Sequence, residues 1–348
     1  MKKTALSLVL SLVLVFSLML TACGNTNPTG GTEPTTTDPT TTEPSSSDQG
    51  GTVTPAGHAH CICGGTASGK GDHVCAEVSD WIDLNANLSD YLAPDGTNYR
   101  LPTGNYYLSA DLALETEKSE AINPVEEAVI SICLNGYKLT YTNKNGYSSK
   151  IFCATNYGAT LNIADCKGTG SVQNDSKTGT TGRIVYGSSD SKTFTLNLFG
   201  GTFKDEMGAK NAGGLFRIGD SVPKTNVVFN MYGGTIDGGY TAGNGGNIAI
   251  YGKMDIYGGV ITNGSVEAGK LGPNIYVTGA ADVTIHGGAV TNGTAGETAL
   301  DIYVNSGKLT IKGLDADMKV YVKNSATFEL GTGLTKEGND TTFTVKKP

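Results

Sequence analysis

The sequence predicts an all-β protein, a right-handed parallel β-helix with an N-terminal cap, preceded by a disordered tether. The first observation behind this prediction is a phrase ending in two glycines, which returns at residues 198–201, 231–234, 256–259 and 285–288. The first glycine of each pair, at positions 200, 233, 258 and 287, follows the previous one by 33, 25 and 29 residues. Unequal steps of this size are typical of a solenoid whose loops differ in length.

The second observation is an alternation of side chains ahead of each glycine pair. Met254 and Ile256 alternate with Lys253, Asp255 and Tyr257, which is the period of a strand with one buried face. The same alternation occurs at Phe194, Leu196 and Leu198; at Val227, Phe229 and Met231; at Val283 and Ile285; and at Leu309 and Ile311. We therefore expect these strands to stack in parallel, with roughly 4.8 Å between layers.

The third observation concerns what lies between those strands. Shorter strands are expected at residues 247–250, 274–277 and 301–304, which begin 27 residues apart. Glycine- and asparagine-rich bends join them, and no segment after residue 150 has an apolar period of 3.6 residues over the length of a helix. One coil would therefore contain two or three short strands, which is the unit of a parallel β-helix.

The chain begins with features of an export signal. Lys2 and Lys3 precede an uncharged apolar run over residues 5–20, and the sequence Leu-Thr-Ala-Cys-Gly follows at 20–24. This ending resembles the lipobox of bacterial lipoproteins, whose cysteine is acylated on its thiol. The resemblance implies a signal peptide over residues 1–22 and a lipid-anchored chain beginning at Cys23, on the outer face of the cell membrane. An ordinary signal peptide or a membrane helix is the alternative.

Residues 23–57 are composed mainly of Thr, Pro, Ser and Gly, so we expect a disordered tether that carries the folded part away from the membrane. The whole chain has 25 basic and 33 acidic residues, for a net charge of −8. Without residues 1–22, which contain two lysines and no acids, the balance is 23 against 33, or −10. This acidic balance argues against a nucleic acid as partner.

Residues 58–78 are rich in cysteine and histidine. Cys61, Cys63, His73 and Cys75 could form a tetrahedral zinc site, because thiolate and imidazole are the ligands that zinc prefers. Their spacing matches no common zinc finger. A disulfide between two of the cysteines, with the histidines merely exposed, is the alternative in an exported protein. Free thiols are the third possibility, and the sequence leaves all three open.

Residues 79–140 do not show the repeat and are expected to form the cap and the early coils, with the β-helix proper over residues 141–348. Such a cap is needed because the first open layer of backbone donors and acceptors would otherwise pair with another chain. A helix is most expected between residues 78 and 92, with Ser79 or Asp80 as its N-cap.

From about Gly57 to its C-terminus the chain resembles a known family, and the sequence His-Ala-His-Cys-Ile-Cys-Gly-Gly at 58–65 is similar to an element often found ahead of the repeats of that family. The sequence Ile-Cys-Leu-Asn-Gly at 132–136, then Gly-Ala-Thr-Leu at 158–161 with Asp165 and Cys166, then the repeated Tyr-Gly-Gly phrases resemble the secreted β-helix surface proteins of bacteria. Those proteins belong broadly to the pectin-lyase-like superfamily. The resemblance implies an architecture and names no reaction, although a minority of the superfamily are polysaccharide lyases or hydrolases. Cys133, Cys153 and Cys166 are expected to be buried as small apolar groups, with a disulfide between successive coils as the alternative.

One outward position of the repeat carries a column of rings. It holds Phe199, Tyr232, Tyr257 and His286. If the coils are in register, these rings lie above one another on the surface, where they could bind a glycan or another surface partner. Stacking that only stiffens the solenoid is the alternative. We call these four residues the aromatic column.

The acidic residues expected to face outward are scattered over the repeat strands. They are Asp237, Asp255, Asp282 and Asp301. A lyase or hydrolase of this fold needs converging carboxylates, and of these residues only Asp255 and Asp282 are candidates to lie close together. We therefore expect a surface module for binding, adhesion or structure more than a catalyst, with a polysaccharide-active enzyme as the alternative.

Overall fold

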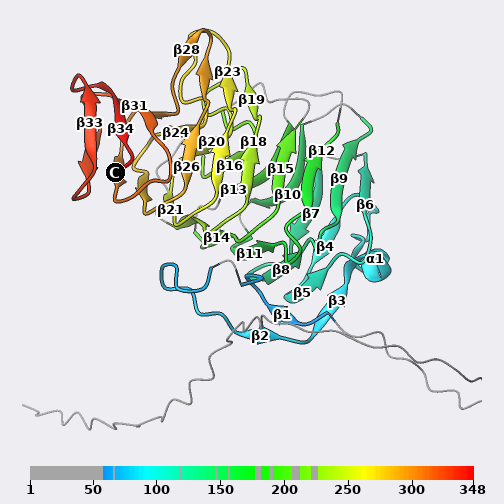
Figure 1. Cartoon of the computed structure of the whole chain (residues 1–348). Coiled ribbons are helices and arrows are strands. Elements are labelled where there is room, and N and C mark those ends of the chain that lie inside the picture. Colours follow the sequence, from blue (N-terminus) through cyan, green and yellow to red (C-terminus); the bar gives the residue numbers. More distant parts are fainter. Residues whose placement is uncertain are drawn as a thin grey trace, which may run out of the picture. The chain divides into compact units, whose positions relative to one another are not determined.

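The computed structural model describes residues 58–348 except 66, 118, 146–147, 156, 177–181, 189–190, 206–211 and 221–225. The predicted signal peptide, the lipidation site Cys23 and the tether lie outside the described residues. Across the described part of the chain the fold is the predicted one, a parallel β-helix made of almost nothing but strands (Figure 1).

Three parallel sheets, counted over the described residues, form the sides of this helix. The ten-stranded sheet has the order β3 (Trp81–Asp83), β5 (Gly104–Tyr107), β8 (Val129–Cys133), β11 (Ala159–Ala164), β14 (Phe194–Leu198), β17 (Val227–Met231), β21 (Lys253–Ile256), β25 (Asp282–Ile285), β30 (Lys308–Ile311) and β32 (Thr327–Leu330). Each strand pairs with its counterpart one coil away, so the sheet runs the length of the solenoid.

The second sheet has eleven described strands, with the order β4 (Tyr99–Leu101), β7 (Glu120–Pro124), β10 (Ser149–Thr155), β13 (Gly182–Ser188), β16 (Phe216–Ile218), β20 (Ile248–Ile250), β24 (Ile275–Val277), β29 (Ile302–Val304), β31 (Met318–Val322), β34 (Thr342–Lys346) and β33 (Thr335–Gly338). Its last pairings, β31 with β34 and β34 with β33, are antiparallel. This final hairpin covers the backbone groups of β31 that another chain could otherwise pair with.

The third sheet has seven described strands, β6 (Leu112–Thr116), β9 (Lys138–Asn143), β12 (Ser171–Asn174), β15 (Thr202–Asp205), β18 (Thr235–Asp237), β22 (Val260–Thr262) and β26 (Ala289–Thr291). A small sheet extends the later coils, with β19 (Tyr240–Thr241), β23 (Ser265–Val266), β27 (Thr294–Ala295) and β28 (Thr298–Ala299). Before the coils, β1 (His60–Cys61) pairs antiparallel with β2 (Glu77–Val78).

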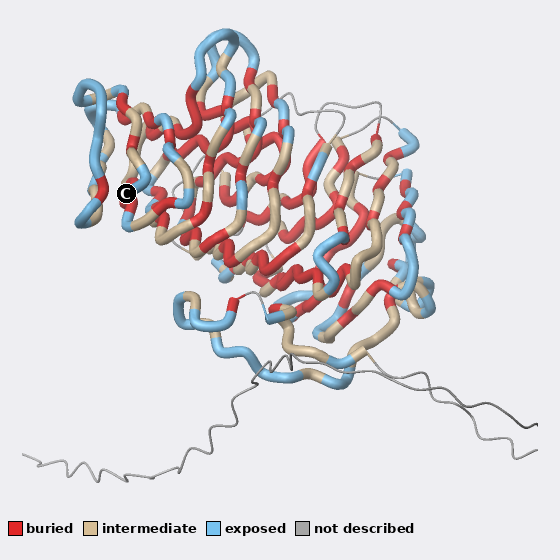
Figure 2. Tube along the Cα trace, viewed as in Figure 1, coloured by how far each residue is buried: buried red, intermediate tan, exposed pale blue. Residues whose placement is uncertain are grey.

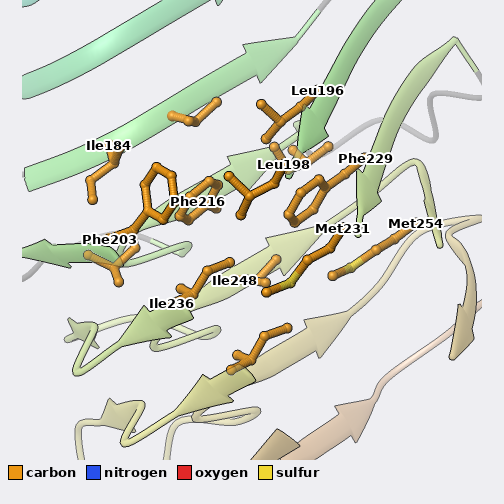
Figure 3. Packing of buried hydrophobic residues seen from close by; sticks show 14 of the residues in the cluster. Ile184, Leu196, Leu198, Phe203, Phe216, Phe229, Met231, Ile236, Ile248 and Met254 are labelled. Atoms are coloured by element: carbon orange, nitrogen blue, oxygen red, sulfur yellow. The ribbon is translucent and has the colours of Figure 1, made fainter. Parts of the chain in front are cut away.

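The core is a set of apolar columns that run along the solenoid axis. Phe229 faces Leu196 on one side and Met254 on the other, and all three side chains are fully buried (Figure 3). The same column continues through Val283 and Leu309. Burying one side chain of this size contributes about 1.5–3 kcal/mol, so the stacking of coils stabilises the fold layer by layer. Figure 2 shows the buried interior continuing from coil to coil.

The second glycine of each repeat phrase makes a turn that other residues would resist. Gly234 and Gly288 have φ angles of 85° and 90°, in the region that favours glycine. A Cβ on Gly234 would lie 2.9 Å from the carbonyl oxygen of Gly201, and one on Gly288 would lie 2.9 Å from that of Gly259. The repeated glycine therefore lets the backbones of successive coils approach each other at this corner.

A buried polar ladder holds another corner of the coils. Asn247 donates from Nδ2 to Oδ1 of Asn274 at 2.8 Å, and Asn274 donates from Nδ2 to Oδ1 of Asp301 at 3.1 Å. All three side chains are buried. The expectation that Asp301 faces outward is therefore wrong, because this position precedes the strand and points into the corner, where it accepts a backbone N–H.

The N-terminal end departs from the prediction in one way. Coils lie within residues 79–140, the stretch expected to hold the cap and the early coils, since β5 and β8 lie in the ten-stranded sheet. A short helix, α1 (Leu84–Asn87), does lie in the expected window and continues as the 3-10 turn η1 (Leu88–Tyr91), but its N-cap is Asp83, not Ser79 or Asp80. Asp83 accepts a hydrogen bond from the backbone of Ala86 at 3.2 Å, because residues 81–83 are already used by β3.

No helix in the described part of the chain is both long enough and apolar enough to cross a membrane.

Candidate functional site

The Cys/His-rich segment, residues 58–78, folds back along the outside of the ten-stranded sheet (Figure 1). Cys63 and Ala67 are fully buried there, packed against Ala164 and the first rings of the aromatic column. Lys70 donates from Nζ to the carbonyl oxygen of Tyr232 at 2.9 Å. The segment is thus fastened to coils that follow it by more than 100 residues in sequence.

The aromatic column forms one continuous stack of rings. Phe199 and Tyr232 have ring centroids 5.0 Å apart, Tyr232 and Tyr257 are also 5.0 Å apart, and Tyr257 and His286 are 4.5 Å apart. The planes of neighbouring rings differ by no more than 16°. Each inner ring therefore has both of its faces covered by its neighbours, and only its edge can face outward.

Half of this column is not exposed. Phe199 is 1% and Tyr232 is 7% exposed, because the ring of His73 lies over both, with centroids 4.8 and 5.5 Å away. The expectation of a solvent-exposed strip is wrong for these two residues. Tyr257 and His286 keep part of their surface. Sequence periodicity places the rings in a column, but it contains no sign that a segment far upstream covers them.

Three of the four predicted metal ligands meet. The Sγ atoms of Cys61, Cys63 and Cys75 are 3.2 Å (61 to 63), 2.6 Å (63 to 75) and 2.8 Å (75 to 61) apart, and we call this group the three-thiol cluster. His73 is not part of it, since its ring packs on the aromatic column and its buried Nε2 has no hydrogen-bond partner among the described residues.

The electrostatics of the three-thiol cluster favour a negative charge on one sulfur. Burial raises the pKa of the Cys63 thiol, but hydrogen bonds from Cys75, from the backbone of Ala67, from Cys61 and from the backbone of Gly65 lower it more, so its pKa lies below the ordinary value. Burial and its thiol neighbours raise the pKa of Cys75. Backbone N–H donors around a thiolate are what a metal-bound cysteine uses to share its charge.

A second group of potential metal ligands was missed by the sequence analysis. It consists of His58, His60, Cys133 and Cys166, whose ligand atoms all lie within 4.8 Å of one another. We call it the bridging cluster, since it joins the Cys/His-rich segment to the end of β8 and to the turn after β11. Burial, followed by His60 and Lys167, lowers the pKa of His58 to about 4, and burial raises the pKa of Cys133 to about 12.

The expectation that Cys133 and Cys166 are inert apolar groups overlooked this arrangement, because the two cysteines are 33 residues apart and more than 70 residues beyond His60. The number of cysteines and histidines could have suggested a second site. Beyond Cys23, three histidines and three cysteines fall within residues 58–75, and three further cysteines follow. No disulfide joins any of the cysteines that the structure describes.

The outer face of the eleven-stranded sheet carries a second set of rings. It consists of Tyr186, Arg217, Tyr251, Tyr276, Tyr303 and Tyr321, which we call the tyrosine–arginine face. Tyr303 stacks on Tyr321 at 4.5 Å and lies 6.2 Å from Tyr276. The guanidinium of Arg217 lies 5.7 Å from the ring of Tyr186 and 5.5 Å from that of Tyr251. Five of the six are half-buried, so part of each remains accessible.

The two carboxylates considered for catalysis do not lie directly opposite each other on neighbouring strands. Asp255 is 5% exposed, and its oxygens bind Nζ of Lys253 at 3.0 Å and Nε2 of His286 at 3.1 Å. Asp255 alternates with the core residues Met254 and Ile256 and so faces outward, but it is not freely exposed. Asp282 lies opposite Lys253 on the neighbouring strand, while Asp255 lies opposite Thr284. This arrangement neutralises Asp255 within an ion-paired group and leaves it no second carboxylate in register.

Comparisons with protein-family models, with curated proteins and with solved structures return no match for this chain. The functional argument therefore rests on the residues themselves.

Proposed function

We propose that this protein is a binding module of the cell surface, anchored by lipid at Cys23, whose β-helix presents the tyrosine–arginine face to a glycan. The observation that carries the proposal is the register of that face. Tyr186, Arg217, Tyr276, Tyr303 and Tyr321 occupy the same outward position of the eleven-stranded sheet on different coils, interrupted by Ala249.

Tyrosine and arginine are the side chains that recognition surfaces favour, because they combine a large contact area with hydrogen-bonding groups. On this sheet they are held by strands whose inner faces are fully buried, such as Ile302 and Val304 on either side of Tyr303. Few side-chain rotations therefore have to be frozen when a ligand binds, which lowers the entropic cost of binding.

A polysaccharide fits this face better than an irregular partner because the face itself repeats. Coils are spaced by about 4.8 Å, so the hydroxyl groups of tyrosines on neighbouring coils, such as Tyr303 and Tyr321, recur at about that interval. Tyr303 and Tyr321 stack face to face, which leaves ring edges and hydroxyls for the ligand. Burial and Tyr321 raise the pKa of Tyr303, so its hydroxyl remains a neutral donor to sugar hydroxyls.

The test is glycan-array screening of the purified full chain, followed by titration calorimetry with the best ligand. Tyr303→Ala and Arg217→Ala should each weaken binding by about tenfold or more, which corresponds to about 1.4 kcal/mol. Tyr240→Ala is the matched control, because Tyr240 lies on β19 of the small sheet and is 42% exposed. Its affinity should equal that of the unmodified chain.

Two results would overturn the proposal. One is the absence of glycan binding, or binding that Tyr303→Ala and Arg217→Ala leave unchanged while circular dichroism shows them folded. The other is release of reducing sugar or unsaturated product that Asp255→Ala or Asp282→Ala abolishes, which would make the protein a polysaccharide-active enzyme.

We further propose that the three-thiol cluster holds a structural zinc ion. Its sulfurs lie closer together than the roughly 3.8 Å separating two thiolates around tetrahedral zinc, where each Zn–S bond is about 2.3 Å, yet well beyond the roughly 2.04 Å of a disulfide. All three sulfurs lie within 3.2 Å of one another, which a disulfide between two of them would leave unexplained. A bound zinc would neutralise the thiolates and hold the Cys/His-rich segment in its turn. Metal analysis of protein purified without chelators tests this: a chain that holds no zinc, or one with a disulfide among these cysteines, rejects it.

A further inference from the structure

We infer that the bridging cluster is a separate metal site, a zinc site with two cysteine and two histidine ligands that fastens the Cys/His-rich segment to two coils of the β-helix. The site is independent of the three-thiol cluster and shares no ligand with it. Two imidazoles and two thiols are a ligand set that zinc uses in closed structural sites.

The geometry brings four donor atoms to one point. Nε2 of His58 lies 2.6 Å from Nε2 of His60, and one ring nitrogen of each lies within 4.8 Å of the Sγ atoms of Cys133 and Cys166. Ligands around tetrahedral zinc are separated by roughly 3.3–3.8 Å, given bonds of about 2.0 Å to nitrogen and 2.3 Å to sulfur. Small side-chain adjustments would therefore place all four atoms around a single ion.

The surroundings orient His60 as a ligand. Its Nδ1 lies 2.5 Å from the carbonyl oxygen of Cys61, so Nδ1 carries the proton and Nε2 presents its lone pair to the centre of the cluster. Metal-binding histidines commonly donate their other ring N–H to a carbonyl or carboxylate in this way, which fixes both the tautomer and the ring orientation.

The surroundings of Cys133 also favour its role as a ligand. Cys133 is fully buried, and its sulfur accepts hydrogen bonds from the backbone N–H groups of Asn135 and Cys166. The segment approaches this point closely, since a Cβ on Gly64 would lie 3.4 Å from Cα of Cys166. Gly64 has a φ of 58°, so its backbone favours glycine as well.

An aromatic shell closes the remaining side. The ring of His58 stacks on Tyr107 at 4.5 Å, and Trp81 packs against His58 at 5.1 Å and His60 at 4.6 Å. The indole Nε1 of Trp81 donates to the carbonyl oxygen of Val78 at 3.0 Å. These contacts hold both imidazoles in place and limit their access to water, which strengthens binding of a cation by the four ligands.

A disulfide between Cys133 and Cys166 is the competing explanation. A disulfide would involve only the two sulfurs. It would not explain why two imidazole nitrogens lie 2.6 Å apart and close to those sulfurs. A zinc ion accounts for all four donors at once. It would also connect residue 60 to residues 133 and 166, closing loops of 73 and 106 residues in sequence.

The experiment measures zinc in the full chain, purified without chelators and dialysed, by inductively coupled plasma mass spectrometry. His58→Ala/His60→Ala should lose one equivalent of zinc relative to the unmodified chain. Cys153→Ser is the matched control, because Cys153 is a buried cysteine of β10 outside both clusters and should keep the full content. Fluorescence of Trp81, the only tryptophan, reports whether the surroundings of the site remain folded.

The ligand set is tested in the variant Cys61→Ser/Cys63→Ser/Cys75→Ser, which retains only the bridging cluster. X-ray absorption at the zinc edge should show two sulfurs at about 2.3 Å and two nitrogens at about 2.0 Å. Cys166→His should keep the metal and change the shell to one sulfur and three nitrogens. This variant also guards against a simple failure to fold.

Three results would overturn the inference. They are a zinc content that His58→Ala/His60→Ala leaves unchanged, an absorption spectrum without the two-sulfur, two-nitrogen shell, and a disulfide between Cys133 and Cys166 found by peptide mapping without reductant. If the three-thiol cluster holds no zinc but the bridging cluster does, the unmodified chain contains one equivalent and the triple serine variant still contains one, so the two proposals fail separately.

Discussion

Replacing Asn274 by alanine should destabilise the β-helix far more than its small change in volume suggests. The carboxamide is fully buried at the centre of the polar ladder. It accepts a hydrogen bond from the backbone N–H of Gly264 at 2.9 Å and donates to the carbonyl oxygen of Thr291 at 2.7 Å. Alanine leaves both backbone groups without these partners.

The magnitude follows from those two groups. Gly264 is buried, so its unsatisfied N–H costs about 1–3 kcal/mol, while the half-buried Thr291 can recover part of its loss from water and costs about 1 kcal/mol. Asn247 and Asp301 each keep backbone partners and add little. The free energy of unfolding should therefore fall by about 2–4 kcal/mol in Asn274→Ala.

Urea unfolding followed by circular dichroism measures this loss. The control is Asn305→Ala, whose half-buried side chain donates to Oγ1 of Thr278 at 3.2 Å and can be replaced by water, so its cost should stay below about 1 kcal/mol. If Asn274→Ala costs no more than Asn305→Ala, the ladder is not what holds this corner of the coils together, and the reasoning is refuted.

Four further predictions follow from other parts of the molecule. Phe199→Ala should lower the free energy of unfolding by about 3–5 kcal/mol, because it removes a buried ring beneath the Cys/His-rich segment, and urea unfolding checks this. Chelation of zinc should change the fluorescence of Trp81 and open residues 64–75 to protease; unchanged emission and cleavage would contradict both zinc proposals. Cys23→Ala should move the protein from the membrane fraction to the medium, as immunoblotting of fractions would show; retention in membranes would reject the lipid anchor. Burial raises the pKa of Asp301 above its ordinary 3.8, so between the unfolded and folded pKa values the folded protein holds a proton that the unfolded chain has released, and this contribution to stability is lost as pH rises through the folded pKa. Asp301→Asn should remove that component of the pH dependence in urea titrations.

The sequence was sufficient for what depends on local period. Alternation at Met254 and Ile256, together with the recurrence of glycine pairs, determines which side chains face inward and how the coils align. Each coil contacts only its neighbours, so the alternation of apolar residues in one repeat predicts which residues pack against it in the next. The same logic placed Tyr232 and Tyr257 in one stack.

What the sequence could not supply depends on contacts between distant segments. Burial of Phe199 requires His73 to pack on it, and the bridging cluster requires residues 58, 133 and 166 to meet. No periodicity relates these positions, because the Cys/His-rich segment is not a coil of the solenoid. Proximity in the chain therefore suggested His73 as a ligand beside Cys61 and Cys63. In the folded protein, the residues that meet are those close in space.

Asp301, at the end of the polar ladder, differs from Asn247 and Asn274 because its hydrogen-bond partners differ. Asn247 and Asn274 each use Oδ1 to accept a glycine N–H and Nδ2 to donate to a threonine carbonyl. Asp301 keeps the first role, accepting from Gly293 at 2.9 Å, but its other oxygen faces the backbone N–H of Lys319, also at 2.9 Å. An asparagine oriented as in the earlier coils would place a donor against that donor. The change from asparagine to aspartate thus follows from the change of partner where the coil after β29 shortens, and the buried carboxylate is stabilised there by these N–H donors and by the charge of Lys319.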